Sequence, residues 1–331
     1  MNDRAVSLLE QYDIEVLRTR KGRGAILCDT DKGCLIFKEY AGNENKIHIQ
    51  DRLLHYIQDM GRVRTEMIYP TKEGNLLVRD MEGVSYVLKT YCEGRECNVY
   101  EKKECLEAVK LLARLHLCME ITPEQVFFEK TSGRGFSAGK EYEKHNRELR
   151  RVRKYLKQKG QKTWFEICLL NYFDYFLEQA LTVTEEWTQY RLGENEAQGE
   201  QILFCHGDYQ YHNILWDQEN WFIVNFEKCL PDNPIRDLYL FMRKLLEKSN
   251  WSVSLGKELL SAYEEERPIT ALSRIDLYYR LSYPEKFWKI ANFYYNSGKA
   301  WIPERNREKL EKLVAQEKEK QAFLHQVFRS F

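Results

Sequence analysis

The chain has 331 residues, of which 43% are hydrophobic and 13% aromatic, so it can bury a sizeable core and does not have the composition of a disordered protein. Lysine plus arginine equals aspartate plus glutamate at 51 each, a balance that gives no sign of a nucleic-acid partner or a membrane surface. No apolar run approaches the ~20 residues that span a bilayer, and the first residues lack the apolar core of a signal peptide. We therefore expect an intracellular protein without membrane insertion.

The nine cysteines are scattered along the chain, their number is odd, and no two form a Cys-x-x-Cys pair. A disulfide framework or a zinc ribbon needs closer and more regular spacing. We therefore expect reduced, mostly buried thiols, as in a cytosolic protein.

The N-terminal part of the chain has the pattern of a small sheet with one helix. Five apolar segments separated by glycine-containing turns predict strands: 15–19, 24–29, 33–38, 76–81 and 85–91. Residues 44–60 carry apolar side chains at helical spacing and predict an amphipathic helix, and residues 1–12 predict a shorter one. Such a lobe would bind a nucleotide and end in a hinge, where the backbone of Thr90, Tyr91 and Cys92 would pair with an adenine edge.

Lys38 closes one of these strands. A lysine at this place is either a solvated edge residue or, in a kinase-like lobe, the side chain that reaches the nucleotide phosphates. In an active kinase the helix supplies a glutamate to pair with that lysine, and our register puts Gln50 there, which can hydrogen-bond Lys38 but brings no charge. Residues 20–24, with two glycines and three cations, form either a poor phosphate-cradling loop or a plain basic hairpin.

From about residue 99 onward the pattern is helical. Amphipathic or apolar periodicity predicts helices at 105–119, 140–162, 164–187, 231–248 and 306–331. The helix 140–162 is strongly basic, which fits either polyanion binding or, as we expect in a neutral chain, a solvated face. Residues 281–296 are rich in aromatic side chains and would cover a large apolar surface.

The most informative stretch lies at 204–227. An apolar run leads into His206-Gly207-Asp208, four residues separate that aspartate from Asn213, and a second apolar run ends at Asn225-Phe226-Glu227. This is the pattern of a phosphoryl-transfer catalytic loop followed by a metal-binding strand end. Asp208 would accept the proton of an attacking hydroxyl group, and Asn213 would hold a magnesium ion.

Position 225 would normally carry the second metal ligand, an aspartate, and here it is Asn225. Magnesium prefers hard, charged oxygens, and its charge screens the phosphates in the transition state. Asparagine offers a neutral oxygen, so metal binding is expected to be weakened. Glu227, two residues on, could partly substitute as a ligand. Asp237 lies near the start of the next helix, where an acidic side chain caps free N–H groups.

The loop of Asp208 and Asn213, the strand of Lys38 and the segment Arg236-Asp237-Leu238 resemble the aminoglycoside phosphotransferase and choline-kinase-like branch of the protein-kinase fold. Three further segments resemble the CotS-type spore coat proteins of endospore-forming Firmicutes: 12–16, 69–75 and the Tyr-Pro-Glu-Lys-Phe-Trp block at 283–290. The branch usually ends its metal-binding strand in Ile/Val-Asp-Phe-Asp/Glu, so Asn225 is a departure.

The resemblance implies an α+β, protein-kinase-like bilobal fold with a small antiparallel-sheet N-lobe, residues 1–94, and a large, mostly helical C-lobe, residues 95–331. It implies a protein made in the cytoplasm of the mother cell and placed in the spore coat. Its partners would be other spore coat proteins and a nucleotide. The implied cofactors are ATP and Mg²⁺, and in the kinase-like lobe an Asp237-type residue also braces the catalytic loop.

Three interpretations of the chain remain open. The first is a degenerate kinase that acts in coat assembly or ligand binding, which the changes at Gln50, Asn225 and the 20–24 loop favour. The second is an active ATP-dependent phosphotransferase on a small hydroxyl-bearing substrate, with Asp208 as base, Lys38 as phosphate clamp, and Asn213 and Glu227 as metal ligands. The third treats the His-Gly-Asp pattern as a turn in an unrelated helical protein, and the order of strands before helices argues against it.

Overall fold

The computed structural model describes residues 7–22, 24–121, 138–192, 202–297 and 304–328. The chain divides into two compact units, each assembled from three stretches of sequence. The first unit contains residues 1–131, 201–241 and 262–268, and the second contains residues 132–200, 242–261 and 269–331. The boundary at residue 94 between an N-lobe and a C-lobe stays a prediction.

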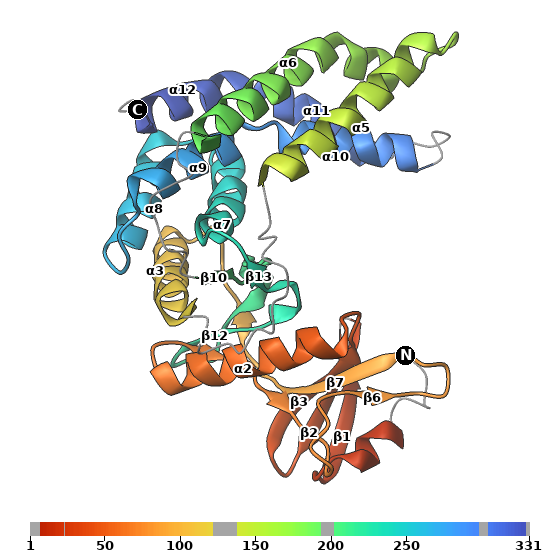
Figure 1. Ribbon diagram of the computed structural model, residues 1–331, viewed down its shortest axis with the longest axis vertical. Coiled ribbons are helices and arrows are strands. Elements are labelled where there is room, and N and C mark those ends of the chain that lie inside the picture. The colour runs from red at the N-terminus through yellow and green to blue at the C-terminus, as the bar shows by residue number, and fades with distance from the viewer. Residues whose placement is uncertain (1–6, 23, 122–137, 193–201, 298–303, 329–331) are drawn as a thin grey trace. The chain divides into compact units, whose positions relative to one another are not determined.

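The largest sheet of the first unit is antiparallel, with the order β1-β2-β3-β7-β5 and with β6 also paired to β7 (Figure 1). Its strands are β1 (Val16–Lys21), β2 (Ala25–Thr30), β3 (Gly33–Glu39), β5 (Ile68–Tyr69), β6 (Val78–Arg79) and β7 (Ser85–Thr90). Residues alternate between buried and less buried along β3, as expected for a sheet with one covered face. The strand predicted at 76–81 is shorter than expected, because only Val78 and Arg79 pair with β7.

One helix accompanies this sheet, α2 (Glu44–Met60), as Figure 1 shows. The side chain of Asn43 accepts a hydrogen bond from the amide of Lys46 and caps its start, and Gly61 ends it at φ 64°, a conformation that glycine adopts without steric cost. The predicted helix 44–60 is thus confirmed. A short 3-10 turn, Ser7–Gln11, lies within the helix predicted at 1–12, of which residues 1–6 fall outside the described residues.

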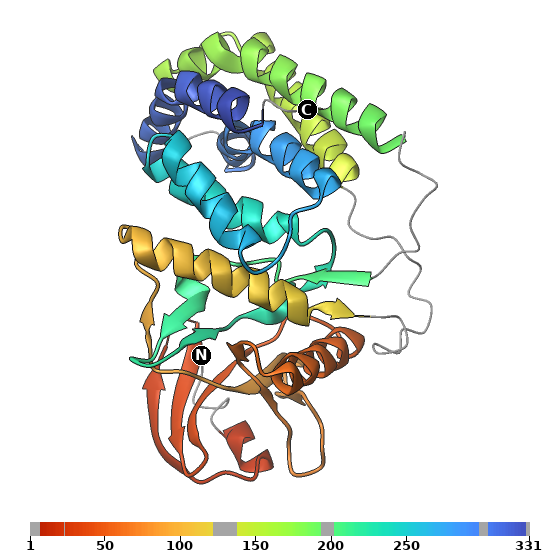
Figure 2. The same cartoon turned by 90° about the vertical axis from the view of Figure 1, so that its left-hand side faces the viewer.

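Several short strands complete the first unit. β10 (Ile202–Cys205) pairs with β9 (Glu120–Ile121) and β13 (Leu230–Pro231), and a second small sheet has the order β4-β12-β11-β8. That second sheet consists of β4 (Arg64–Thr65), β8 (Arg95–Glu96), β11 (Ile214–Trp216) and β12 (Trp221–Ile223). Figure 2 shows α3 (Lys102–Cys118) running alongside these strands. This framework holds the 204–227 stretch against the larger sheet.

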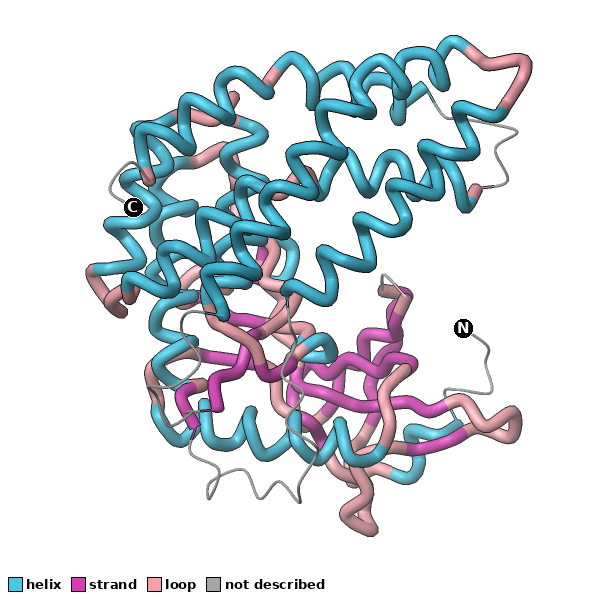
Figure 3. The backbone as a smooth tube through the Cα atoms, turned by 45° about the horizontal axis from the view of Figure 1, so that its top comes forward, coloured by secondary structure: helices cyan, strands magenta, loops and turns pink. Residues whose placement is uncertain are grey.

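The described part of the second unit is helical, whereas the strands all belong to the first (Figure 3). Its helices are α5 (Ala138–Gln158), α6 (Trp164–Leu192), α9 (Ala271–Ser282), α10 (Glu285–Asn296), α11 (Glu304–Ala315) and α12 (Glu317–Val327), with the later part of α7 (Ile235–Lys248) and most of α8 (Val253–Glu264). Antiparallel strands near the N-terminus and helices after them agree with the predicted α+β class. No described helix combines the length and the apolar character needed to cross a bilayer.

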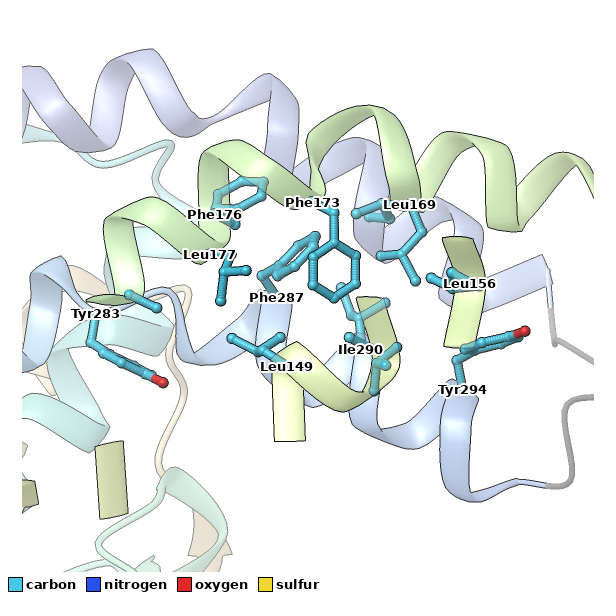
Figure 4. Packing of buried hydrophobic residues seen from close by; sticks show 14 of the residues in the cluster. Leu149, Leu156, Leu169, Phe173, Phe176, Leu177, Tyr283, Phe287, Ile290 and Tyr294 are labelled. Atoms are coloured by element: carbon cyan, nitrogen blue, oxygen red, sulfur yellow. The ribbon is translucent and has the colours of Figure 1, made fainter. Parts of the chain in front are cut away.

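Aromatic side chains from α6 and α10 form the centre of the second unit's core (Figure 4). The ring of Phe287 stacks on Phe176 at 4.5 Å between centroids and meets Phe173 edge-on at 5.1 Å. The aromatic-rich segment 281–296 therefore supplies core, but it is not one helix. α9 ends at Ser282 and α10 begins at Glu285, because Pro284 disfavours helical backbone at the residue before it and cannot donate a helical hydrogen bond.

The last predicted helix, 306–331, is also divided. α11 ends at Ala315 and α12 begins at Glu317, while residues 329–331 fall outside the described residues. Between them the side chain of Gln316 donates a hydrogen bond to the backbone oxygen of Glu247 at 2.9 Å. The amphipathic pattern continues through the break, so periodicity alone could not reveal it.

Candidate active site

The predicted catalytic loop follows β10 and begins with a turn that only glycine accommodates. Gly207 has φ 78°, and a Cβ atom added there would lie 2.8 Å from the carbonyl carbon of Lys228 and overlap its oxygen. The chain then passes through a 3-10 turn, Tyr211–Asn213, into β11. After β12 it returns beside the loop through Asn225, which has φ 69° and ψ 56°. Asparagine tolerates this left-handed conformation better than most residues do.

Asp237 braces this loop from the start of α7. Its carboxylate accepts the backbone N–H groups of His206 at 2.6 Å and Gly207 at 2.9 Å, and the ring of His116 at 3.2 Å. Burial opposes ionisation of Asp237, but these hydrogen bonds outweigh it and lower its pKa. Burial lowers the pKa of His116, so the ring is neutral, donates from Nε2 to Asp237, and accepts the Tyr263 hydroxyl at Nδ1, 2.7 Å away. His116 is therefore a supporting residue of the loop.

Asp208 and Asn213 lie together on the loop. The side-chain amide of Asn213 donates to the backbone oxygen of Asp208 at 2.8 Å, and Asn213 itself is 1% exposed. The carboxylate of Asp208 is half-buried and pairs with the ammonium group of Lys228 at 3.0 Å. A carboxylate with one exposed partner remains accessible to a ligand.

Lys38 reaches the end of the second apolar run. Its Nζ donates to the side-chain oxygen of Asn225 at 2.9 Å and lies 3.0 Å from a carboxylate oxygen of Glu227. The other side-chain atom of Asn225, Nδ2, donates to the side-chain oxygen of Asn213 at 2.6 Å. The structure thus brings together Lys38, Asn213, Asn225 and Glu227, four of the residues that the sequence singled out.

A second lysine, which is not among the predicted site residues, lies behind this group. Lys89 on β7 is fully buried and donates to Glu66 at 2.9 Å and to Glu227 at 2.6 Å. Glu66, 2% exposed, also accepts the backbone N–H of Phe226 at 3.0 Å. A charged residue inside the apolar strand 85–90 was a signal for Lys89, since a lysine is rarely buried without a partner. Glu66 lies between two short strands and carried no such signal.

Opposite charges in this network lie close together and stabilise one another. Burial opposes ionisation of Glu227, but the ammonium groups of Lys89 and Lys38 outweigh it and lower the pKa of Glu227 to about 2. Burial likewise opposes the charge on Lys89, and the two carboxylates Glu66 and Glu227 raise its pKa. Glu227 and Lys89 are therefore both charged at neutral pH.

Gln50 lies apart from this network. It is 3% exposed on the buried side of α2, and neither atom of its side-chain amide has a hydrogen-bond partner. The expected hydrogen bond between Gln50 and Lys38 is absent from the described residues, and the partner of Lys38 is Glu227. Because Glu227 already supplies the negative charge, Lys38 does not need a glutamate from α2.

The expected hinge follows β7. The amide of Thr90 donates to Met67 at 2.8 Å and that of Tyr91 to Cys34 at 3.0 Å, so the sheet uses both donors. Within the described residues the amide of Cys92 has no backbone partner. The side chains of Tyr91 and Cys92 pack against an apolar cluster formed by Leu215 and Phe222 of the second small sheet and by Val224, which follows β12. Of the three hinge residues, Cys92 is best placed to pair with a base.

The first hairpin is joined to this hinge by charge. Arg20 on β1 contacts the carboxylates of Asp29, at 2.8 Å, and Glu93. Asp29, Cys34 and Glu93 are the one group of three metal-type side chains found in the described parts of the chain. Because Arg20 neutralises both carboxylates, this is an ion-pair cluster and not a metal site. Arg23 of the 20–24 loop falls outside the described residues.

The three residues that the sequence assigns to a metal do not form a good magnesium site as they are arranged. The oxygen of Asn225 accepts from Lys38, the oxygen of Asn213 accepts from Asn225, and the carboxylate of Glu227 accepts from two lysines. Magnesium prefers charged oxygen ligands, and the one charged oxygen donor among the three, Glu227, is paired with Lys38 and Lys89. The assignment of metal ligands stays a prediction, and this donor set argues against it.

Comparison with known proteins places the chain in a family. The sequence model of the family described as "Spore coat putative kinase YutH" matches residues 5–327. Spore coat protein S of Bacillus subtilis (strain 168) is 28% identical over 123 residues, which cover 37% of this chain and 35% of that protein. The predicted resemblance to spore coat proteins is confirmed.

Solved structures support the fold. An aminoglycoside phosphotransferase from Alicyclobacillus acidocaldarius superposes with a TM-score of 0.81 and 19% identity over 99% of this chain and 96% of that one. Spectinomycin phosphotransferase in complex with ADP and spectinomycin superposes with a TM-score of 0.57 and 13% identity over 95% and 92%. At these identities the likeness shows the fold alone, and it confirms the predicted kinase-like fold.

Proposed function

This chain belongs to the spore coat putative kinase YutH family, and on that premise we propose that it is a degenerate kinase whose active-site fold serves coat assembly or ligand binding instead of phosphoryl transfer. Family membership places it among spore coat proteins. The role in assembly, its synthesis in the mother cell, and its partners among other coat proteins belong to the proposal. Because the match covers 35% of spore coat protein S, the activity of that relative is not part of the premise.

One observation carries the proposal: the direct hydrogen bond of 2.6 Å between Asn225 and Asn213. In a phosphotransferase the corresponding acidic and amide side chains share a divalent ion that screens the phosphates. Here the two neutral amides are hydrogen-bonded to each other, and Lys38 donates to the side-chain oxygen of Asn225. The loss of one charged ligand weakens metal binding, on which phosphoryl transfer depends, more than it weakens any other function of the site.

The competing candidate is an active, ATP- and magnesium-dependent phosphotransferase on a small hydroxyl-bearing substrate. The bracing of the loop by Asp237 favours it, since this keeps Asp208 in a defined position beside Asn213. Asp208 could then accept a proton from an acceptor hydroxyl group. A precise loop is also compatible with a binding role, so the bracing by itself does not decide between the two.

An ATP turnover assay separates the two candidates without knowledge of the acceptor, because water can serve as one. We expect the wild-type protein with ATP and Mg²⁺ to turn over at the level of Asp208→Ala, and Asn225→Asp to be the faster variant. Wild-type turnover more than about a hundredfold above Asp208→Ala, and not increased by Asn225→Asp, would establish the active candidate instead.

A genetic test addresses the coat directly. In a sporulating host that lacks the chromosomal copy, the Asp208→Ala protein should restore the coat protein profile and lysozyme resistance as fully as the wild-type protein. A deficit equal to that of the deletion strain, with normal amounts of the variant protein in the spore, would mean that coat formation needs the carboxylate.

A further inference from the structure

We propose that this site binds a nucleoside polyphosphate without a divalent metal, with lysine ammonium groups in the place of magnesium. The inference rests on the proposed function and deepens it, because it names the ligand class of the degenerate site. It starts from the observation that Asn213, Asn225 and Glu227 are a poor set of ligands for magnesium as they are arranged. Three steps carry it: the position of the ammonium groups, the charge balance, and the surface open to a base.

The first step concerns position. The ammonium group of Lys38 lies 2.9 Å from the side-chain oxygen of Asn225 and 3.0 Å from the carboxylate of Glu227. It therefore contacts two of the three oxygen donors that a metal would need. A second ammonium group, Lys228, lies 3.0 Å from the carboxylate of Asp208 and is 67% exposed, so it can turn toward a ligand. Lysine is a point-charge partner that binds phosphate oxygens well.

The second step concerns charge. The ion pairs around Asn225 join three cations, Lys38, Lys89 and Lys228, to three anions, Glu66, Glu227 and Asp208. Each lysine is within ion-pair distance of a carboxylate of this set, so the six charges balance. An aspartate at position 225 would leave one negative charge in excess, which a divalent ion would offset. Asn225 removes that charge, and the site can receive a polyphosphate without first gaining a cation.

The orientation of Asn225 reinforces this balance. Its amide is held at both ends, because the oxygen accepts from Lys38 and the nitrogen donates to Asn213. The backbone fixes it as well, in the left-handed conformation at φ 69°. Turning the amide would put its N–H₂ group against the ammonium of Lys38. The side chain therefore orients Lys38 instead of ligating a metal.

The third step concerns the base. The amide of Cys92 has no backbone partner in the described part of the chain, and the side chains of Tyr91 and Cys92 border an apolar cluster that contains Leu215 and Val224. An apolar surface beside a free backbone donor suits a purine, which has flat faces and a polar edge. Lys38 lies on β3, which pairs with β7 just before this hinge. A base and a polyphosphate can thus be bound by one unit of the chain.

Calorimetric titration with ATP tests the proposal in two buffers, one with EDTA and one with Mg²⁺. We expect the wild-type dissociation constants in the two buffers to agree within about threefold. Lys38→Met should weaken binding in EDTA by about tenfold or more, whereas Lys32→Met, which removes a lysine from a surface ion pair with Asp31, should not. Asn225→Asp should bind at least about tenfold more tightly with Mg²⁺ than with EDTA.

Wild-type binding that is about tenfold or more tighter in Mg²⁺, or no binding in EDTA, would overturn the proposal. Inorganic tripolyphosphate, which lacks the nucleoside, tests whether the base contributes to binding. If tripolyphosphate binds as tightly as ATP, the proposal that the site recognises a nucleoside is wrong. Circular dichroism melts of each variant show whether it is folded, and Asn225→Asp does not depend on the outcome for Lys38→Met. Metal-dependent binding of ATP without turnover would contradict this inference but leave the proposed function in place. Efficient ATP turnover would contradict the proposed function.

Discussion

The buried lysine behind the site offers the sharpest test of how the first unit is held together. In Lys89→Met the side chain keeps a similar length and loses its charge. Glu66 and Glu227 then lose the ammonium group that lies 2.9 Å and 2.6 Å from them. We expect a large loss of stability, because an ionised carboxylate that is buried without its partner costs several kcal/mol.

The structure gives two routes to the magnitude. The pKa of Glu227 lies at about 2, against an ordinary value of 4.5, and at about 1.4 kcal/mol for each pH unit this net shift, which already includes the opposing effect of burial, corresponds to about 3 kcal/mol. Removal of one partner from a buried ion pair costs ~3–5 kcal/mol in other proteins. Since Glu66 is more deeply buried than Glu227, we expect a loss of about 3–5 kcal/mol at neutral pH.

The pH dependence follows from the direction of the shift. A carboxyl group whose pKa is lower in the folded state stabilises the protein above its unfolded pKa and loses this effect as the pH falls. The contribution of Glu227 is therefore complete above about pH 4.5 and disappears toward about pH 2. The difference in stability between the wild type and Lys89→Met should be constant near neutral pH and shrink below about pH 4.5.

Urea denaturation followed by circular dichroism measures the loss, and hydrogen exchange of the Phe226 amide, which donates to Glu66, reports on the network locally. Lys110→Met is the matched control, because it removes a lysine from a partly exposed ion pair with Glu265 and should change stability little. A loss below about 1 kcal/mol for Lys89→Met, or protection of Phe226 equal to the wild type, would refute the reasoning.

Other positions give independent predictions. Asp237→Asn keeps the shape of the side chain but weakens its bonds to the His206 and Gly207 amides; we expect a loss of ~2–4 kcal/mol in urea denaturation, and an unchanged midpoint would contradict the bracing role. Gly207→Ala would bring a Cβ atom onto the backbone of Lys228, so a thermal melt should show a large fall in Tm, whereas a wild-type Tm would mean that the loop relaxes freely. Phe287→Ala removes a ring that is 0% exposed and should cost ~3–5 kcal/mol in the denaturation of the second unit; less than about 1 kcal/mol would show that its core collapses around the gap.

Local signals were reliable where they come from neighbouring residues. The apolar segment at 33–38 beside glycine-containing turns predicted β3. The spacing of apolar residues in 44–60 predicted α2, because burial on one side of a helix repeats with its period. The asparagine at position 225 was also visible in the sequence, because the short motif around it usually has an aspartate at that place. The break at Gln316 within the predicted helix 306–331 was missed, because it depends on a tertiary contact.

The partner of each side chain was harder to predict. The sequence paired Lys38 with Gln50, since a helix glutamate usually has that role, but Lys38 lies against Asn225 and Glu227. It proposed Glu227 as a reserve metal ligand, and Glu227 is bound to Lys89, a residue 138 positions away in the chain. No local pattern records such a contact, because the two side chains meet only after β7 and the end of β12 have been packed together.

By itself the sequence determined the kinase-like order of strands and helices, and it predicted that Asp208 and Asn213 share one loop and that position 225 has an asparagine in place of an acidic ligand. These are properties of single segments, which are set by periodicity and by the chemistry of a few adjacent side chains. Only the tertiary structure decided which charges meet: Lys89 with Glu66, and Lys38 with Glu227. Electrostatic pairing acts through space over a few ångströms, so it depends on the fold as a whole and leaves little trace in any one segment.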